Sequence, residues 1–291
     1  GGNLDATNII NNTLLAVLVS ISMDHMSFLG NTLSEIAEKK AGIIKEGCHV
    51  VTVRQKPEVM EVICEKCRSN HAECTVADAA QAQVAEEGVE GQTIIYEKER
   101  YRIPLAGIYQ KENAVAALNA LKVLDGLGFP TTAEQKKEGL EKVSWNGRFT
   151  VLDTEPLFVV DGAHNPAAAD MLVQSIEHYF KGKRLIYIMG VFSDKDYQGV
   201  IRKTAPLADQ IFTIQTPDNV RALPAQKLAE AIKEINPHVE AAESVKAAVE
   251  KAYGLAEDKD VILAFGSLSF IGIMTEIVEE EKKKRKEQQN D

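Results

Sequence analysis

From residue 157 onward, short apolar runs alternate with amphipathic segments, and this pattern restricts the possible fold more than any other feature. The apolar runs are rich in β-branched and aromatic residues, which is typical of strands covered on both faces. The segments between them have the apolar spacing of helices. Such alternation predicts an α/β fold with a mainly parallel, doubly wound sheet. The expected strands cover 157–160, 185–189, 210–214 and 261–265, and the expected helices cover 167–180, 197–205, 225–235, 244–253 and 268–282.

The first part of the chain shows the same kinds of element in a less regular order. Continuous apolar runs at 14–21 and 49–53 predict two buried strands. A helix is expected between them at 31–44, and another begins at Pro57. These elements also favour an α/β arrangement.

A boundary divides these two patterns. Residues 85–92 are acidic and contain glycine, which favours an exposed loop, and 93–104 reads as a small hairpin. A helix of small residues begins at Asn113, and helical patterning stops at 144–148. We therefore predict two domains, covering 1–146 and 147–291.

Composition and charge argue against several functions. The formal net charge of -10 is unlike that of a general nucleic-acid binder. No apolar run approaches the roughly 20 residues that cross a membrane. Four cysteines are too few for a disulfide scaffold, so a cytoplasmic, reducing compartment is expected. Cys64, Cys67, His71 and Cys74 have a spacing that could suggest zinc, but the second distant ligand pair of a zinc finger is missing, and we interpret them as incidental.

The polar stretch Asp161-Gly162-Ala163-His164-Asn165-Pro166 directly follows an expected strand. Pro166 suits the first turn of the helix that comes next. In an open α/β sheet, ligands usually bind at this carboxyl end of the strands. Asp and Asn are also common in ordinary turns and helix caps. These six residues alone therefore fit a ligand site and a structural turn equally well.

Other polar residues occupy comparable places in the second half. Arg148 lies ahead of the first strand, Asp194-Lys195-Asp196 follows Gly190, and Gly266-Ser267 follows the last strand. Arg and Lys suit anionic ligands, and Asp suits a ribose hydroxyl, a cation or an amine. Polar turns at the carboxyl ends of adjacent strands would line one cleft. These residues indicate an enzyme with an anionic ligand.

Two residues of the first part are weaker candidates. His25 follows the expected strand at 14–21, and Lys40 lies in the next expected helix. A single His is commonly structural, and a single helical Lys is commonly a solvated charge. Neither residue predicts a site by itself.

Short motifs follow one another along the whole chain. They are 1–8 (GGNLDATN), 22–25 (SMDH) with 29–32 (LGNT), 40–45 (KAGIIK), 109–110 (YQ) with 113–114 (NA), 145–149 (WNGRF), 161–166 (DGAHNP), 190 with 194–196 (DKD), and 266–268 (GSL). In this order they closely resemble the folylpolyglutamate synthases, including the bifunctional dihydrofolate synthase form, of the Mur ligase superfamily. The resemblance implies the C-terminal part of a Mur-ligase-type ATPase domain followed by a Rossmann-like domain.

The resemblance also implies a reaction. In that family, ATP phosphorylates a carboxylate of the folate substrate, and the amine of L-glutamate attacks the acyl phosphate to form an amide. The expected partners are ATP, L-glutamate and a reduced folate (dihydropteroate or tetrahydrofolate), with no nucleic acid or membrane. Mg²⁺ ions and protein cations would neutralise charge around the transferred phosphoryl group. Members of the family tend to be monomers.

Individual residues receive roles from the same resemblance. His25 would ligate magnesium, and Lys40 would be carbamoylated, giving a negative charge where a free lysine would repel the metal. The other implied roles are ATP contacts at Asn113, Arg148 and Asp161, substrate binding at Leu4, Asp5, Ala6 and Ser267, and catalysis at His164 together with Lys40.

The sequence departs from the family pattern in places. It contains no Gly-Lys-Gly-Ser or Gly-Lys-Gly-Thr phosphate loop, and the family's magnesium-binding Glu ahead of residues 1–5 is absent. We therefore expect an N-terminally truncated chain that is inactive alone, because the chemistry requires a phosphate cradle. Tyr109 replaces a frequent His and Asn3 a frequent Arg, which affects the expected adenine and pterin contacts.

Two other functions remain open from the sequence. The chain could belong to another Mur-type amide ligase that acts on peptidoglycan precursors. It could also be a non-catalytic fragment that binds a nucleotide or glutamate. Assays that compare muramyl with folate substrates distinguish a peptidoglycan-precursor ligase from a folate ligase. Release of phosphate by the chain would contradict a non-catalytic function.

Overall fold

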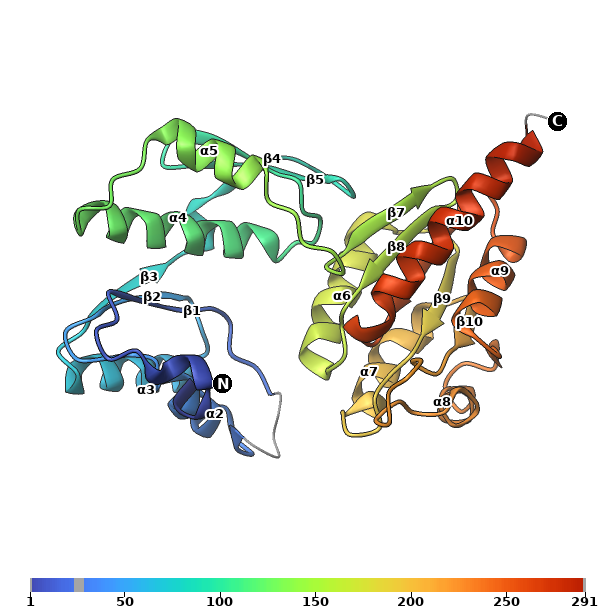
Figure 1. Cartoon of the computed structure of the whole chain (residues 1–291), viewed down its shortest axis with the longest axis horizontal. Coiled ribbons are helices and arrows are strands. Elements are labelled where there is room, and N and C mark those ends of the chain that lie inside the picture. Colours follow the sequence, from blue (N-terminus) through green and yellow to red (C-terminus); the bar gives the residue numbers. More distant parts are fainter. Residues whose placement is uncertain (1, 24–28, 290–291) are drawn as a thin grey trace. The chain divides into compact units, whose positions relative to one another are not determined.

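Three β-sheets organise the part of the chain that the computed structural model describes, residues 2–23 and 29–289. The chain divides into two compact units, each described by itself below. Unit 1 contains 1–87, 91–104 and 109–143, and unit 2 contains 88–90, 105–108 and 144–291. The predicted α/β fold with mostly parallel strands is confirmed (Figure 1).

Unit 1 contains a parallel sheet and an antiparallel sheet of three strands each. The parallel sheet has the order β1-β2-β3, and the antiparallel sheet has the order β4-β5-β6. The strands are β1 (Leu15–Leu18), β2 (His49–Val53), β3 (Glu73–Ala77), β4 (Gln83–Gly88), β5 (Gly91–Tyr96) and β6 (Glu99–Ile103). The helices are η1 (Gly2–Leu4), η2 (Ala6–Ile9), α2 (Leu33–Ala41), α3 (Pro57–Ser69), η3 (Ala79–Gln81), α4 (Gln110–Gly126) and α5 (Ala133–Glu141).

Helices cover both faces of the parallel sheet in unit 1. Ile36 of α2 and Ile63 of α3 pack with Ala16, Leu18 and Val50 of the strands in one apolar core. Helix α4 contacts all three strands and packs on the opposite face (Figure 1). This two-sided burial explains the continuous apolar runs of β1 and β2.

The segment 85–92, expected to be an exposed loop, is instead part of a hairpin. Strand β4 extends to Gly88 and β5 begins at Gly91, so only the turn separates them. The acidic side chains of β4 are largely exposed, which hides the strand from a reading based on apolar patterning. Gly91 has a φ of +121°, a conformation that glycine adopts readily at such a turn.

An acidic side chain fixes the turn between α4 and α5. Asp125 accepts hydrogen bonds from the Thr131 amide (2.7 Å) and the Thr131 hydroxyl (2.7 Å), and forms an ion pair with Lys136 (2.6 Å). These contacts lower the pKa of Asp125 from 3.8 to about 2, and the hydrogen bond from Lys136 contributes more than those from Thr131. The carboxylate form is therefore the one that stabilises the turn.

This lowered pKa predicts acid sensitivity in unit 1. Because the folded pKa lies below the unfolded value, the stabilisation is fully present above about pH 4 and is lost as pH falls through about 2. We expect Asp125→Asn to make the urea midpoint of unfolding less dependent on pH across that window. Glu61→Gln, at an exposed carboxylate of α3, is the matched control. An unchanged pH dependence in Asp125→Asn would contradict the assignment.

Unit 2 is built on a six-stranded sheet with the order β11-β10-β9-β12-β8-β7. All neighbouring strands are parallel except β7 and β8, which are antiparallel. The strands are β7 (Thr150–Thr154), β8 (Leu157–Asp161), β9 (Leu185–Met189), β10 (Gln210–Thr213), β11 (Val239–Ala241) and β12 (Val261–Phe265). The helices are α6 (Pro166–Tyr179), α7 (Tyr197–Thr204), η4 (Ala205–Leu207), α8 (Ala225–Lys233), α9 (Val245–Leu255), η5 (Leu268–Phe270) and α10 (Ile271–Gln289).

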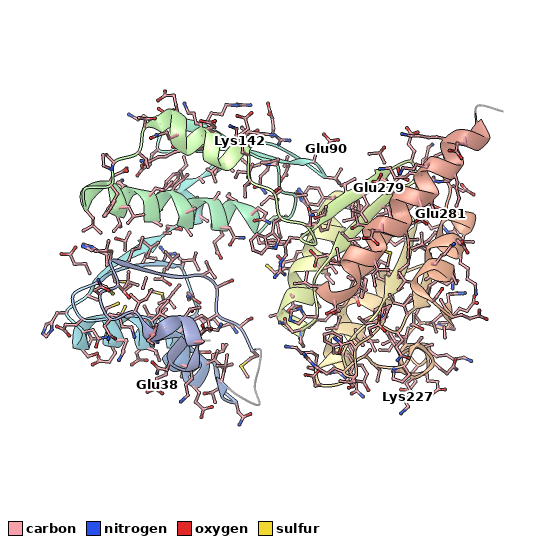
Figure 2. All side chains as sticks on the ribbon, viewed as in Figure 1. Glu38, Glu90, Lys142, Lys227, Glu279 and Glu281 are labelled. Atoms are coloured by element: carbon pink, nitrogen blue, oxygen red, sulfur yellow. The ribbon has the colours of Figure 1, made fainter. Side chains whose placement is uncertain are left out.

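Residues of the central strands alternate between two apolar cores. Tyr187 and Leu263 lie in the core that holds residues of α6, α7 and α8, and Ile186 and Ile262 lie in the core that holds residues of α9 and α10. Both faces of the sheet are thus covered by helices (Figure 1). The helices are amphipathic, as Lys227 of α8 shows by its exposed position beside the buried Leu228 (Figure 2).

Polar contacts also hold the last helix on the sheet. Arg285 of α10 forms an ion pair with the buried Asp153 of β7, and its guanidinium lies 3.9 Å from the ring centroid of Tyr253. The Tyr253 hydroxyl donates to the same carboxylate at 2.9 Å. This cluster secures α10 close to strand β7.

Candidate active site

The strand order of unit 2 gathers the predicted polar turns at one edge of its sheet. Strand β12 lies between β8 and β9, and Phe265 is in register with both Asp161 and Met189. The segments after these strands, 162–166, Gly190 and Gly266–Ser267, are therefore neighbours. This edge, at the carboxyl ends of the strands, is the usual place for ligands in an open α/β sheet.

Two glycines allow the ends of β9 and β12 to approach closely. Gly266 has a φ of +114°, and a Cβ atom there would lie 2.4 Å from the carbonyl oxygen of Gly190. The Gly190 amide donates to the Phe265 carbonyl at 3.2 Å. No other residue type fits this backbone approach without a shift of the main chain.

Leu268 joins three motifs that are far apart in the sequence. Its side chain would be 2.4 Å from a Cβ at Gly162 and 3.1 Å from one at Gly147, so it packs directly on both glycines. The motifs 145–149, 161–166 and 266–268 therefore meet at one place in unit 2. Their convergence shows that Arg148, Asp161 and Ser267 lie in one neighbourhood.

Asp161 is buried, and backbone amides bind its carboxylate. Its Oδ2 accepts from the Phe149 amide at 2.9 Å, and its Oδ1 accepts from the Ala163 amide at 2.8 Å. Asp161 thus connects the loop at 147–149 to the turn that follows β8.

Arg148 has a different environment from Asp161. Its side chain is half-buried, and no hydrogen bond or ion pair to it occurs within residues 2–23 and 29–289. A guanidinium presents five N–H donors in a planar fork suited to phosphate or carboxylate oxygens. Arg148 is therefore a cation with its hydrogen-bonding capacity available to a ligand.

The residues after Asp161 begin helix α6. Asn165 is the N-cap, and its Oδ1 accepts from the Ala168 amide at 2.8 Å, with Pro166 in the first turn. The Nδ1 of His164 lies 2.8 Å from the Gly162 carbonyl oxygen. Because a carbonyl only accepts, Nδ1 must donate, so in the neutral ring Nε2 is the acceptor. The turn therefore fixes the tautomer of His164.

Ser267 and the acidic motif at 194–196 are engaged in local structure. Ser267 is buried and caps η5, its hydroxyl accepting from the Ser269 amide at 3.2 Å. Asp196 caps α7 through the Gly199 amide at 2.9 Å. Asp194 forms an ion pair with Arg221 at 2.8 Å. The two acidic side chains of the motif 194–196 thus take part in an ion pair and a helix cap.

In unit 1, the segment 2–8 packs on the end of helix α2. A Cβ at Gly2 would lie 1.8 Å from the Lys39 carbonyl oxygen, and a Cβ at Gly42 would lie 1.7 Å from Oδ1 of Asn3. The Asn8 side-chain amide donates to the Gly42 carbonyl at 3.1 Å. The segment that contains Asp5 and Ala6 is thus brought beside the C-terminal end of α2.

Lys40 lies in the last turn of α2 and is half-buried. The C-cap Gly42 donates its amide to the carbonyls of Lys39 and Lys40. Asp5 caps η2, and hydrogen bonds from Thr7 lower its pKa below the ordinary value. The structure therefore places Lys40 and Asp5 in the same part of unit 1.

Asn113 lies in the first turn of α4, also in unit 1. Its Nδ2 donates to Oε1 of the buried Gln110 at 3.0 Å, and the side chain is exposed. The amide oxygen and one N–H of Asn113 are not used in that bond. Burial raises the pKa of the adjacent Glu112 above its ordinary value.

Some predicted residues lie outside the described part of the chain. This applies to the whole of His25 and to the side chain of Leu4. Within residues 2–23 and 29–289, no group of three or more His, Cys, Asp or Glu side chains could hold a metal ion.

The four cysteines form no disulfide bond: all of them are free, and burial raises the pKa of the Cys67 thiol to about 12. In the described residues, no helix combines the length and apolar character needed to cross a membrane.

Sequence reasoning did not identify Phe149 and Leu268 as important parts of this site. Phe149 has a left-handed backbone with φ of +48°, which no sequence pattern predicts for a phenylalanine. Leu268 is 44% exposed and packs on two glycines. The glycines themselves were the available signal, because glycine in a polar turn often marks a close approach of another group.

Comparison with known families agrees with this architecture. The model of the Mur ligase middle domain matches residues 6–121, and that of the Mur ligase glutamate ligase domain matches residues 147–268. Together these matches cover most of the chain, and the chain belongs to the Mur ligase family.

Curated relatives that share one name match most of the chain. The chain is 32% identical over 280 residues to the dihydrofolate synthase/folylpolyglutamate synthase of Bacillus subtilis, covering 93% of the chain and 64% of the relative. It is 33% identical over 283 residues to the protein of the same name from Mycobacterium tuberculosis, covering 89% of the chain and 56% of the relative. The chain thus spans a little over half to under two thirds of these relatives.

Solved structures show the same similarity. A folylpolyglutamate synthase of Mycobacterium tuberculosis, complexed with ADP and AMPPCP, matches with a TM-score of 0.81 and 29% identity, covering 96% of the chain and 66% of that structure. The Thermotoga maritima folylpolyglutamate synthase matches with a TM-score of 0.75 and 27% identity, covering 96% of the chain and 63% of that structure.

Proposed function

We propose that this chain forms part of an ATP-dependent ligase that adds L-glutamate to a reduced folate. The observation that supports it most is that motifs 145–149, 161–166 and 266–268 meet in unit 2. At this meeting point Arg148 has no hydrogen-bond or ion-pair partner in the described residues. The names of the relatives supply the substrate class, a folate with a free carboxylate. Dihydropteroate and tetrahydrofolate are both included in the proposal.

In the proposed reaction, ATP transfers its terminal phosphoryl group to the folate carboxylate. The glutamate amine attacks the resulting acyl phosphate, phosphate leaves, and an amide bond forms. Arg148 would bind phosphate oxygens, with Asn113 and Asp161 as further ATP contacts. Bound Mg²⁺ would neutralise phosphate charge, and His25 is the proposed ligand for it.

The remaining residues receive roles in the handling of the two substrates. Asp5 and Ala6, with Leu4, would bind the pterin substrate beside Lys40, which is proposed to carry a carbamate. His164 and Ser267 would bind and activate glutamate, and the contact of Nδ1 with the Gly162 carbonyl oxygen orients the ring of His164. A monomer in the cytoplasm fits this role in small-molecule synthesis.

A ligase for peptidoglycan precursors is the second candidate. The two matching domain models favour it, because they describe Mur ligases in general and not the folate enzymes alone. A non-catalytic nucleotide- or glutamate-binding function is the third, because the 291 residues contain no Gly-Lys-Gly-Ser loop to hold phosphates. We expect the chain alone to release no phosphate from ATP.

Nucleotide binding, measured in the longest protein that contains these residues, provides the test. We expect Arg148→Ala to weaken ADP binding about tenfold, the usual size of a lost hydrogen bond to a charged group. Isothermal titration with ADP and Mg²⁺ measures it. Arg202→Ala, at an exposed arginine of α7, is the control and should bind as the unaltered chain does. Equal affinity in all three proteins would refute the role of Arg148.

A further inference from the structure

The backbone of Phe149 is held in an unfavourable conformation. Its φ of +48° lies in the left-handed region, which bulky side chains rarely adopt. Such conformations persist only where the surrounding structure enforces them, and they are common at functional sites. The groups that enforce this one can be identified.

The Phe149 side chain is anchored in the core of unit 2. The ring is only 1% exposed. Its centroid lies 5.5 Å from that of Tyr179 and 5.6 Å from that of Phe180, both in the last part of α6 and its cap. This packing fixes the position of the side chain, but it does not by itself orient the peptide bond before it.

Asp161 supplies that orientation. Its Oδ2 accepts the Phe149 amide hydrogen at 2.9 Å, and its Oδ1 is held by the Ala163 amide at 2.8 Å. Because the amide of Phe149 belongs to the Arg148–Phe149 peptide, the carboxylate fixes the plane of that peptide. Gly147, with φ of +85°, allows the chain to turn on the other side of Arg148.

Arg148 is therefore flanked by two residues with left-handed backbones. Its own side chain makes no hydrogen bond or ion pair to the described residues, so no polar contact of the guanidinium determines where the residue points. The direction of its Cα–Cβ bond follows from the backbone alone. That backbone is determined by the contacts of Phe149 and Asp161.

We propose that Asp161 is a positioning residue that presents Arg148 to the phosphates of a bound nucleotide. It does so by holding the Phe149 amide, and this action is separate from any contact of its own with the nucleotide. The inference rests on the proposed function, in which Arg148 binds phosphate oxygens. Phe149 is the second part of the same device, since its buried ring opposes relaxation of the loop.

The first measurement concerns the geometry and needs no nucleotide. Hydrogen exchange of the Phe149 amide, followed by NMR, should be slow in the unaltered chain and at least tenfold faster in Asp161→Ala. Asp153→Asn is the matched control, because Asp153 is another buried carboxylate of the sheet, bound by Tyr253 and Arg285. Rapid exchange in the unaltered chain, or no change in Asp161→Ala, would overturn the proposal.

The second measurement is a double-mutant cycle on ADP affinity. We expect Asp161→Ala to weaken binding about tenfold more when Arg148 is present than in the Arg148→Ala background, where only a direct contact of Asp161 with the nucleotide can be lost. An equal loss in both backgrounds would show that Asp161 acts independently of Arg148 and would overturn the inference. If Asp161→Ala does not fold, Asp161→Asn takes its place.

These outcomes separate the inference from the proposed function. Failure of the longest protein that contains these residues to bind ADP contradicts the proposed function, whatever the exchange data show. If ADP binds and the effects of Asp161→Ala and Arg148→Ala on its affinity are additive, only the positioning role of Asp161 is contradicted. ADP binding with a non-additive cycle and a protected Phe149 amide supports both.

Discussion

Replacing Gly266 by alanine is expected to lower the free energy of unfolding of unit 2 by about 3 kcal/mol or more. The new Cβ would lie 2.4 Å from the Gly190 carbonyl oxygen, which belongs to backbone and cannot rotate away. The φ of +114° adds strain that an alanine cannot relieve. Strands β9 and β12 would have to separate at the edge of the sheet that carries the candidate site.

Urea unfolding followed by circular dichroism and by tryptophan fluorescence measures this effect. Trp145, in unit 2, is the single tryptophan of the sequence, so its fluorescence reports on that unit. Gly254→Ala is the control, because nothing lies within 4 Å of a Cβ there and the residue is in helix α9. That control should be about 0.5–1 kcal/mol more stable than the unaltered chain. Equal stability of the Gly266→Ala variant would show that this close approach is not required.

Lys40→Ala is expected to have the largest effect on catalysis. If the lysine carries a carbamate, its loss removes a negative charge beside the cations that stabilise phosphoryl transfer. We expect product formation to fall about 10²–10³-fold, the range found when one stabilising group is removed from an active site. The assay must use the longest protein that contains these residues, because the 291-residue chain has no phosphate loop.

Chemical rescue distinguishes a carbamate from a structural lysine. Short carboxylic acids such as acetate should restore part of the activity of Lys40→Ala, since they can occupy the space of the carbamate. Lys39→Ala, at the neighbouring half-buried lysine of α2, should retain activity and show no response to acetate. Full activity of Lys40→Ala without added acid would exclude the carbamate role.

Much of unit 2 was predictable because its strands are buried on both faces. The residues of β8, β9 and β12 form continuous apolar runs, and such runs stand out between amphipathic helices. Strand β7 was missed because its residues are mostly half-buried and include Asp153 and two threonines. Strand β4 was missed for a similar reason, since its side chains are largely exposed.

The candidate site was predictable in composition but not in geometry. Asp161, His164 and Ser267 follow strands, and the rule for open α/β sheets places such residues at one edge. The order of strands was not available from the pattern, so the position of β12 between β8 and β9 had to come from the structure. The left-handed backbone of Phe149 depends on long-range packing and has no local signal.

The roles assigned through the family remain predictions. Lys40, Asn113 and Arg148 lie within the described residues, and His25 lies outside them. Arg148 has the clearest physical support, because it is a half-buried cation with no partner in the described part of the chain.

Formation of a glutamyl amide tests the central claim most directly. The longest protein that contains these residues should be incubated with ATP, Mg²⁺, L-glutamate and either dihydropteroate or tetrahydrofolate, with a muramyl nucleotide in a parallel reaction. Mass spectrometry should detect a folate enlarged by one glutamyl residue, together with ADP and phosphate, only when ATP and glutamate are both present. Product from the muramyl nucleotide alone, or no product from either folate, would contradict the account.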